Sequence, residues 1–391
     1  MKNASCDELI RLRARAQHIA AALPPLERNP DGSLTPQSRE MLHSRMASIL
    51  RKNRAVGASV ILCPPQGKAD IFHFGHARLH PNMPVTASTC FRIASVSKLV
   101  MSFAALSLME DGIVNLDEDI SRYLGYPVRH PLYPDKPVTL RMLLTHSAAI
   151  TDDGSYGTHG MQPGCTLREL LSDPACWRAS APGVSFHYSN LGAGAAGVVL
   201  ERAANLPFDD ILKARIFDPL AIRASYDPRR IIPAGDLADG YSVRGILPPR
   251  LRYDAHALAS RPPEPFDPEH DYLIAAGRMI TDSAGMEKLI RLLASRDGMG
   301  VLSPASLDLM RSPQGCAGRG LNVAFLPDVF PGFSPVGHQG VAYGMCAELF
   351  ADPATGAGVG VMTSGVRLVR QPPLMRAGFD LLALGFAALR S

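Results

Sequence analysis

Both ends of the chain carry strand signals, and the segment between them is mostly helical. Near the start, residues 56–63 and 69–74 predict two strands joined by the turn PPQGK. Near the end, residues 347–363 predict two further strands across the turn DPATG. A sheet has to bury at least one face against another layer. The pattern therefore favours one sheet built from the two ends of the chain, with a helical region inserted between them.

We predict an α+β fold on this basis. Residues 1–90 and 290–391 would form the sheet domain, residues 91–289 a mostly helical domain, and an active site would lie at their interface. The length of 391 residues suits two or three compact units. Residues 226–272 show little periodicity, so we expect either a functional lid or an unstructured excursion there. Helices are predicted at 7–22, 36–52, 98–110 and 374–389.

Composition excludes several functional classes. With 46% hydrophobic and 19% charged residues, the chain is typical of globular proteins, and a net charge of +4 without a basic stripe does not favour nucleic acid as a partner. The seven cysteines are scattered and lack C-x-x-C spacing, so neither a disulfide scaffold nor a zinc site is expected. No stretch reaches the roughly 20 apolar residues that span a bilayer. The N-terminal residues lack the continuous apolar region of a secretory signal, so we expect a cytoplasmic protein without membrane contact.

The first candidate for chemistry is the S-x-x-K pattern formed by Ser95 and Lys98. Positions i and i+3 of a helix are neighbours, about 5–6 Å apart at Cβ, whereas Ser97 points elsewhere. A serine hydroxyl needs a base to accept its proton, and a desolvated lysine is a suitable base. Free backbone N–H groups at a helix N-terminus also stabilise a developing oxyanion. The alternative is a surface serine and lysine that share a turn, since S-x-x-K alone is a weak signal.

The second candidate is the Y-S-N pattern at 188–190, which follows a turn signal and precedes a Gly/Ala-rich helix. In an extended segment, the side chains of Tyr188 and Asn190 fall on the same side. A tyrosine beside a lysine is suited to moving a proton between nucleophile and leaving group. A turn with a capping asparagine is the alternative.

The third candidate is the segment 337–341, which contains His338, Gln339, Gly340 and Val341. Glycine in a strand lets a substrate approach the backbone closely, and the N–H of Val341 would complete an oxyanion hole. His338 would bind a carboxylate or tune the proton network. A histidine in a glycine turn is the alternative.

Other patterns are less informative. Residues 192–197 match G-x-G-x-x-G, but no apolar strand precedes them, so close helix packing explains the glycines better than a dinucleotide site does. His73, His76 and His80 are close in sequence, but their spacing does not suit one strand face, and no metal or cofactor is expected. The absence of G-x-S-x-G gives no support for an α/β-hydrolase.

The three candidates together resemble the serine β-lactamase and penicillin-binding-protein superfamily. Within it, the branch of class C β-lactamases, D-aminopeptidases and related esterases is the most similar. The resemblance covers roughly residues 40–390 and rests on the order and spacing of S-V-S-K at 95–98, Y-S-N at 188–190 and H-Q-G at 338–340. It extends to supporting phrases, among them LRMLLTHSA at 140–148 and IFDPLAI at 216–222.

This resemblance implies an antiparallel sheet flanked by helices and a role for each motif residue. Ser95 would be acylated, Lys98 and Tyr188 would move its proton, and Asn190 would hold Lys98 and the substrate. The N–H groups of Ser95 and Val341 would form the oxyanion hole.

One departure from the family pattern affects the predicted substrate. His338 stands where β-lactamases and transpeptidases usually have a lysine that recognises a carboxylate, and histidine is more similar to the esterase and D-aminopeptidase members. We therefore predict a serine hydrolase, without cofactor, that cleaves a small ester or amide. The alternatives are an acyltransferase with the same acyl-enzyme, a β-lactamase or penicillin-binding DD-peptidase, and a non-catalytic ligand-binding relative.

Overall fold

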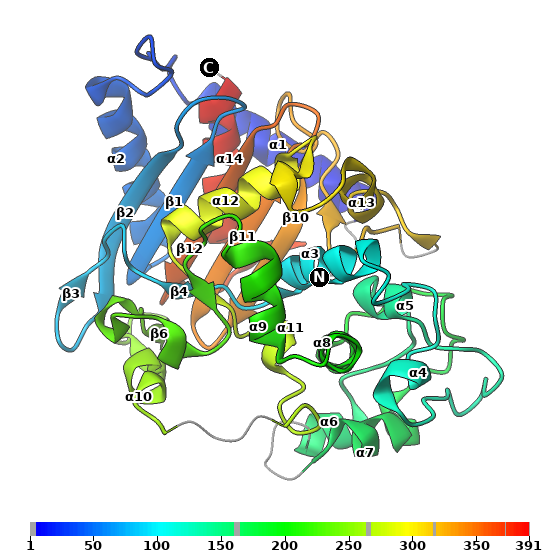
Figure 1. Cartoon of the computed structure of the whole chain (residues 1–391). Helices are drawn as coiled ribbons and strands as arrows, with labels where there is room; N and C mark the ends of the chain where they lie inside the picture. Colours follow the sequence, from blue (N-terminus) through cyan, green and yellow to red (C-terminus); the bar gives the residue numbers. More distant parts are fainter. Residues whose placement is uncertain (1–4, 160–164, 263–266, 316–317, 372, 391) are drawn as a thin grey trace.

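An antiparallel sheet of seven strands forms the centre of the protein (Figure 1). The computed structural model describes residues 5–159, 165–262, 267–315, 318–371 and 373–390. The order of the strands is β3-β2-β1-β12-β11-β10-β9, and every neighbouring pair is antiparallel. Their bounds are β1 Gly57–Cys63, β2 Asp70–Arg78, β3 Met83–Pro84, β9 Ala324–Phe325, β10 Val336–Ala342, β11 Met345–Ala351 and β12 Gly358–Ser364.

The two ends of the chain meet between β1 and β12. Gly57 lies opposite Ser364, and Cys63 lies opposite Gly358. All seven residues of β1 are buried, because neighbouring strands flank it and helices cover both faces. The prediction of one sheet made from both chain ends is confirmed, as is the α+β class.

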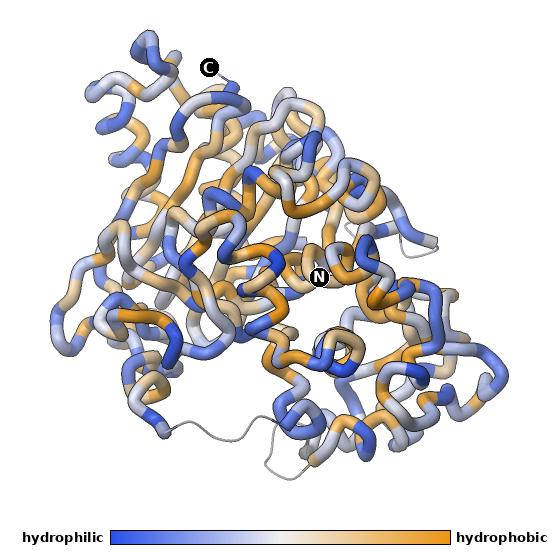
Figure 2. Tube along the Cα trace, in the orientation of Figure 1, coloured by the Kyte–Doolittle hydropathy of each residue, from blue (hydrophilic) through white to orange (hydrophobic). Residues whose placement is uncertain are grey.

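Helices cover both faces of this sheet, which divides the core in two. One face packs against α1 (Cys6–Ala21), α2 (Pro36–Lys52) and α14 (Arg376–Arg390), and the other packs against α12 (Ser283–Ala294) and α3 (Val96–Glu110). Alternation along β1 explains the division, since Ala58, Val60 and Leu62 face α14 whereas Ile61 and Cys63 belong to the other core. Figure 2 shows hydrophobic residues along the strands and a mostly hydrophilic outer end of α2.

The helical region lies beside the sheet, at the lower right of Figure 1. Helix α3 connects the two parts, because it contacts β10 on one side and α8 and α11 on the other. Within the described residues, no helix is both long and apolar enough to cross a bilayer. The helices of this region are α4 Ser121–Leu124, α5 Leu140–Leu144, α6 Gly154–His159, α7 Leu167–Ser172, α8 Asn190–Ala204, α9 Phe208–Leu212 with a π-helical turn at Lys213–Phe217, and α11 Ile274–Gly277, with a 3₁₀ turn at Pro174–Cys176. Helix α13 (Pro304–Met310) follows a 3₁₀ turn at Gly298–Gly300 and lies to the right of β10 in Figure 1, above this region.

The predicted domain boundary between residues 289 and 290 falls inside α12. This helix packs on the sheet, where Met286 and Ile290 lie against Gly360. The division into two domains therefore stays a prediction. Three small sheets complete the described fold. One is formed by β4 Phe91–Arg92, β8 Ile280–Thr281 and β5 Ala224–Ser225, one by β6 Gly240–Ser242 and β7 Arg250–Tyr253, and one by β13 Arg370–Gln371 and β14 Leu374–Met375.

The glycines of the G-x-G-x-x-G pattern lie in α8 and serve close packing. A Cβ atom on Gly194 would lie 2.8 Å from the carbonyl oxygen of Tyr272, and one on Gly197 would lie 2.4 Å from the Cβ of Ala275. Any side chain at these positions would push α8 away from α11 and the residues before it. The interpretation as helix packing is confirmed.

The segment 226–272 contains short regular elements rather than one long loop. They are 3₁₀ turns at Pro228–Arg230 and Ala234–Asp236, the hairpin of β6 (Gly240–Ser242) and β7 (Arg250–Tyr253), and α10 (Ala255–Ala259). The expectation of an unstructured excursion is wrong for the described part of this segment, since residues 263–266 lie outside it.

Glu201 of α8 provides a prediction on pH and stability. It is 6% exposed and accepts a hydrogen bond from the Phe208 N–H at 2.9 Å, and burial raises its pKa from 4.5 to about 8. The folded protein therefore binds this proton more tightly than the unfolded chain does. The contribution of Glu201 to stability is therefore fully present below about pH 4.5 and is lost as the pH rises through about 8.

We expect Glu201→Gln to weaken this dependence. Between pH 5 and pH 9, the wild type should lose at least about 1.4 kcal/mol more unfolding free energy than the variant, which is the value of one pKa unit. Urea unfolding at several pH values measures the difference, with the exposed Glu40→Gln as control. Parallel pH profiles for the wild type and Glu201→Gln would contradict the prediction.

Candidate active site

Ser95 lies at the start of α3, directly after a residue with unusual backbone geometry. Ala94 has a φ of +48°, a left-handed conformation that costs free energy for a residue with a side chain. This turn leaves Ser95 partly exposed, whereas Val96 and the residues after it are buried. Ser97 serves the fold, because its hydroxyl donates to the Ala94 carbonyl at 2.5 Å and accepts from the Met279 N–H at 3.1 Å. The site therefore presents one serine, Ser95.

Lys98 is buried below Ser95, one helical turn later, with 0% of its surface exposed. Its Nζ lies 3.2 Å from Ser95 Oγ, 2.9 Å from Asn190 Oδ1 and 2.5 Å from the Ala276 carbonyl oxygen. Among the described residues, no carboxylate lies within ion-pair distance of this amine, and all three contacts are to uncharged oxygens. A buried amine without a counter-ion, in contact with a hydroxyl, is an arrangement that suits proton transfer.

Tyr188 packs over the lysine from the other side of the site. The centroid of its ring is 5.1 Å from Lys98 Nζ, 4.4 Å from the ring of His146 and 6.2 Å from the ring of His338. Tyr188 comes just before α8, whose first turn is capped by the side chain of Ser189. The extended backbone before this helix brings Tyr188 and Asn190 to Lys98 together.

Asp152 organises the start of α8, and the sequence did not single it out. Its carboxylate accepts hydrogen bonds from Asn190 N at 2.9 Å, Asn190 Nδ2 at 2.8 Å, Leu191 N at 3.0 Å and Ser189 Oγ at 2.8 Å. Because Asn190 Nδ2 donates to Asp152, the amide oxygen of Asn190 is turned toward Lys98. Asp152 is thus a positioning residue for the contact between Asn190 and Lys98. Asp152 lies in a short irregular stretch after Ile150, and no periodic sequence pattern identifies it as a site residue.

Strand β10 borders the site opposite α8, and Gly340 is its point of closest approach. A Cβ atom on Gly340 would lie 2.2 Å from the Ile93 carbonyl oxygen and 2.7 Å from the Ser95 nitrogen. Only glycine fits there, which brings β10 against the first turn of α3. Val341 follows directly and is half-buried. The backbone of β10 therefore borders Ser95. An oxyanion hole would need N–H groups at this place.

His338 is on the same face of β10 as Gly340 and is 1% exposed. Its Nδ1 lies 2.6 Å from the Gln339 carbonyl oxygen, which can only accept, so Nδ1 carries the proton and Nε2 is an acceptor. Burial, with the charges of Arg319 and Lys98 adding to it, lowers the pKa of His338 well below its usual value. His338 is neutral at neutral pH and supplies hydrogen bonding rather than positive charge.

Gln339 projects to the opposite face of the sheet. Its Nε2 donates to Glu348 Oε1 at 2.6 Å, and a Cβ atom on Gly378 of α14 would collide with that same oxygen. Burial raises the pKa of Glu348 well above its usual value, so this pair is uncharged. The side chain of Gln339 therefore lies apart from the cluster around Ser95, and any substrate contact at this position would involve its backbone.

Two further buried residues near Tyr188 were not predicted. His146, 4% exposed and with a φ of +56°, accepts a bond from the Ser189 N–H at its Nδ1, and burial lowers its pKa well below the usual value. Arg319, 1% exposed, holds its guanidinium 4.9 Å from the Phe186 ring. Burial lowers the pKa of Arg319 to about 10, so it stays cationic at neutral pH. The site therefore combines neutral histidines with buried basic groups.

Gly340→Ala is expected to lower any Ser95-dependent activity about tenfold or more. The added methyl group has to displace β10 or the first turn of α3, and such overpacking costs about 1–3 kcal/mol. Gly235→Ala is the matched control, because a Cβ atom there meets nothing within 4 Å. The effect is measured by comparing the acylation rates and the thermal unfolding temperatures of the two variants. Equal rates for Gly340→Ala and Gly235→Ala would contradict the proposed closeness of β10 to Ser95.

The chain matches known proteins over much of its length. The Beta-lactamase family model matches residues 41–378. Penicillin-binding protein 4* of Bacillus subtilis (strain 168) is 25% identical over 202 residues, which are 48% of this chain and 43% of that protein. Esterase EstB of Burkholderia gladioli is 32% identical over 203 residues, which are 46% of this chain and 50% of that protein. The chain thus spans about half the length of these curated relatives.

Solved structures give the same fold. The D-amino acid amidase from Ochrobactrum anthropi SV3, in complex with D-phenylalanine, superimposes with a TM-score of 0.68 at 22% identity, over 89% of this chain and 98% of the amidase. At this identity, the likeness supports the fold alone. The family model, in contrast, covers most of the chain and includes Ser95, Lys98, Tyr188 and His338. This chain belongs to the β-lactamase family, within the superfamily of serine β-lactamases and penicillin-binding proteins.

Proposed function

We propose that the protein is a serine hydrolase that cleaves a small ester or amide through an acyl-enzyme on Ser95. The observation that carries the proposal is the 3.2 Å separation of Lys98 Nζ and Ser95 Oγ, with the amine buried and its other partners uncharged. A ligand-binding protein does not require a buried lysine beside a partly exposed serine. The names of the relatives, an esterase and a penicillin-binding protein, and that of the structural neighbour, an amidase, support this class of reaction.

In the proposed acylation, Ser95 Oγ attacks the carbonyl carbon of the substrate while its proton passes to Lys98 or Tyr188. The N–H groups of Ser95 and Val341 donate to the oxyanion that forms. The bond to the leaving alcohol or amine then breaks, and the transferred proton goes to that group. In deacylation, water attacks the acyl carbon and the bond from this carbon to Ser95 Oγ breaks. A proton from the water passes to Oγ, which restores the hydroxyl and releases the carboxylic acid.

The neutral state of His338 favours esters and amides over penicillins. A histidine that burial keeps uncharged does not offer a carboxylate the positive charge that lysine supplies at this position in β-lactamases. We therefore propose weak or no penicillin hydrolysis and favour the esterase and amidase reactions.

The test compares the wild type with Ser95→Ala on a nitrophenyl butyrate, a D-alanyl anilide and a penicillin. Product release and intact mass are followed together. We expect turnover of the ester or the anilide and an acyl adduct in the wild type, and neither in Ser95→Ala. The matched control is Ser97→Ala, which removes a neighbouring hydroxyl of the same helix and should keep the adduct.

Other outcomes would change the proposal. A long-lived penicillin adduct on Ser95 would indicate a penicillin-binding role. Product formation that rises with an added alcohol, with transfer of the acyl group to it, would indicate an acyltransferase. Neither turnover nor adduct with all three substrates would contradict the proposed reaction.

A further inference from the structure

A cavity lined by arginines lies outside the Ser95 cluster. It has a volume of about 890 Å³ and is formed by the β6–β7 hairpin, the β10–β11 turn and the segment that follows β12. Four arginines line it, and its lining contains no acidic residue. These arginines are Arg244, Arg250, Arg252 and Arg367.

The four arginines are available to a ligand. All four are exposed, and in the described part of the chain none of them forms an ion pair within 4.0 Å. Four like charges around one cavity repel each other, so their placement is unfavourable until an anion neutralises them. Arginine also binds phosphate and carboxylate through two parallel N–H bonds.

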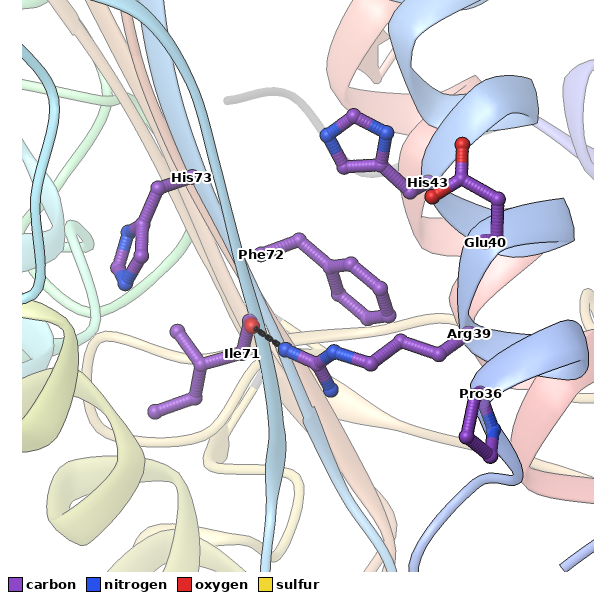
Figure 3. A pocket seen from close by; sticks show the side chains of 7 residues that line it. All are labelled: Pro36, Arg39, Glu40, His43, Ile71, Phe72 and His73. Atoms are coloured by element: carbon purple, nitrogen blue, oxygen red, sulfur yellow. Dashed lines mark hydrogen bonds between the residues drawn. The ribbon is translucent and has the colours of Figure 1, made fainter.

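In the described structure, the lining arginine of the smaller cavity between α2 and β2 has an acidic partner, unlike the arginines of the larger cavity. The smaller cavity has a volume of about 370 Å³, and its arginine, Arg39, donates to the Ile71 carbonyl (Figure 3). Arg39 also pairs with Asp70 at 3.1 Å. Glu40 lines the same cavity, so this site carries its own counter-charges. The larger cavity has no such group in its lining.

The walls of the larger cavity are fixed by contacts from several elements. Arg54, just after α2, donates to the carbonyl groups of Gly245 and Leu247 in the β6–β7 loop. The backbone of Arg367 donates to the Asn53 carbonyl at 2.7 Å. A Cβ atom on Gly344 would lie 2.2 Å from the Tyr241 carbonyl oxygen, so the hairpin rests directly on the β10–β11 turn. These contacts hold the backbone segments that carry the arginines in place.

One wall of the cavity is joined to the strand beside Ser95. Tyr343 lines the cavity and lies three residues after Gly340, which contacts the first turn of α3. At about 3.3 Å per residue in a strand, this wall begins within about 10 Å of Gly340. The guanidinium of Arg92, three residues before Ser95, lies 4.7 Å from the Tyr343 ring. A substrate of moderate length can reach from Ser95 to this wall.

We propose that this arginine cavity binds an anionic group, a phosphate or a carboxylate, of the substrate that acylates Ser95. Exposed Leu247 and Leu368 would contact the apolar part of such a molecule. The proposal rests on the proposed function, because it identifies the substrate class of the same site. It assigns a role in specificity to part of the segment 226–272.

The first experiment uses three matched esters that differ in where they carry charge. Phenyl butyrate is neutral, phenyl hemiadipate carries a carboxylate on the acyl side, and 4-carboxyphenyl butyrate carries one on the leaving group. The variants are Arg252→Gln and Arg367→Gln, from two separate walls of the cavity. The control is Arg390→Gln at the end of α14, which also removes one exposed charge but lies far from β6 in Figure 1.

We expect the wild type to prefer one of the carboxylated esters. Each cavity variant should lower kcat/KM for that ester about 3- to 10-fold and leave the neutral ester unchanged, and Arg390→Gln should change neither. The position of the preferred carboxylate tells whether the acyl part or the leaving group reaches the cavity. Equal ratios of charged to neutral turnover in the cavity variants and in Arg390→Gln would overturn the proposal.

A second measurement separates this proposal from the proposed function. Inorganic pyrophosphate is titrated calorimetrically into the wild type and the three variants, which requires no turnover. Weaker binding in Arg252→Gln and Arg367→Gln, without hydrolysis of any ester, would support the anion site while the proposed reaction fails. Absence of pyrophosphate binding together with unchanged ester ratios would refute the site while the reaction stands.

Discussion

Lys98→Ala is expected to keep its fold and to lose acylation of Ser95. The value of kcat/KM on a nitrophenyl ester should fall by roughly 10²- to 10⁴-fold, the range that a positioned proton acceptor contributes. The reason is geometric, since Lys98 Nζ is 3.2 Å from Ser95 Oγ. The other two partners of Nζ, the Asn190 amide oxygen and the Ala276 carbonyl oxygen, accept hydrogen bonds from it but are not bases that could replace it. Intact-mass detection of the acyl adduct measures the loss directly.

A second variant separates the loss of the base from the loss of packing. Lys98→Met fills most of the same buried volume without a basic group, so it should be as inactive as Lys98→Ala and unfold at a higher temperature. Normal acylation in either variant would remove Lys98 from the proton transfer. Tyr188, whose ring lies 5.1 Å from Lys98 Nζ, would then be the base to test next.

Local spacing explains which parts of the site were predictable from sequence. Ser95 and Lys98 are one helical turn apart, so their contact follows from i,i+3 geometry. Tyr188 and Asn190 lie on either side of Ser189, the extended residue that caps α8, and both reach the same lysine. Gly340 could be predicted to allow close approach, although only the fold reveals that its neighbours are Ile93 and Ser95. The pairs that were predictable are therefore separated by only two or three residues of sequence.

The residues that were missed depend on contacts between distant segments. Asp152 lies in an irregular stretch and meets Asn190 only through the folding of the helical region. Arg319 is isolated in sequence, and its burial beside Phe186 depends on the packing around it. Three arginines of the larger cavity lie within residues 244–252, but the fourth, Arg367, is separated from Arg252 by about 115 residues of sequence. Neither composition nor hydrophobic periodicity reveals contacts between residues that are far apart in the sequence.

The side chains of the segment 337–341 do not all face the site, as Gln339 shows. The segment 337–341 was predicted as one substrate-binding unit, but successive side chains of a strand point to opposite faces. His338 and Gly340 face α3 and the site, whereas the side chain of Gln339 binds Glu348 on the side of α14. The contribution of this segment to the site therefore comes from alternate side chains and from the backbone.

Asp152→Ala is expected to lower kcat about 100-fold, although Asp152 does not touch Ser95. Its carboxylate holds Asn190 Nδ2 at 2.8 Å, and this bond fixes the amide so that Asn190 Oδ1 faces Lys98 at 2.9 Å. Without it, the amide can rotate and present its NH₂ group to Lys98 Nζ, so that two hydrogen-bond donors would face each other. The loss also leaves the N–H groups of Asn190 and Leu191 without their acceptor, which should cost about 1–3 kcal/mol of stability.

Asp173→Ala distinguishes this positioning role from a general loss of stability. The carboxylate of Asp173 also accepts several hydrogen bonds, from Ala175 N and Ser155 N at 2.9 Å each and from the Ser155 hydroxyl, but it contacts none of the residues around Lys98. We expect Asp173→Ala to lower the unfolding temperature with kcat unchanged. Asp152→Asn, which retains one acceptor oxygen, should fall between the wild type and Asp152→Ala in kcat. Equal kcat values for Asp152→Ala and Asp173→Ala would mean that the carboxylate of Asp152 stabilises α8 and does not orient Asn190 toward Lys98.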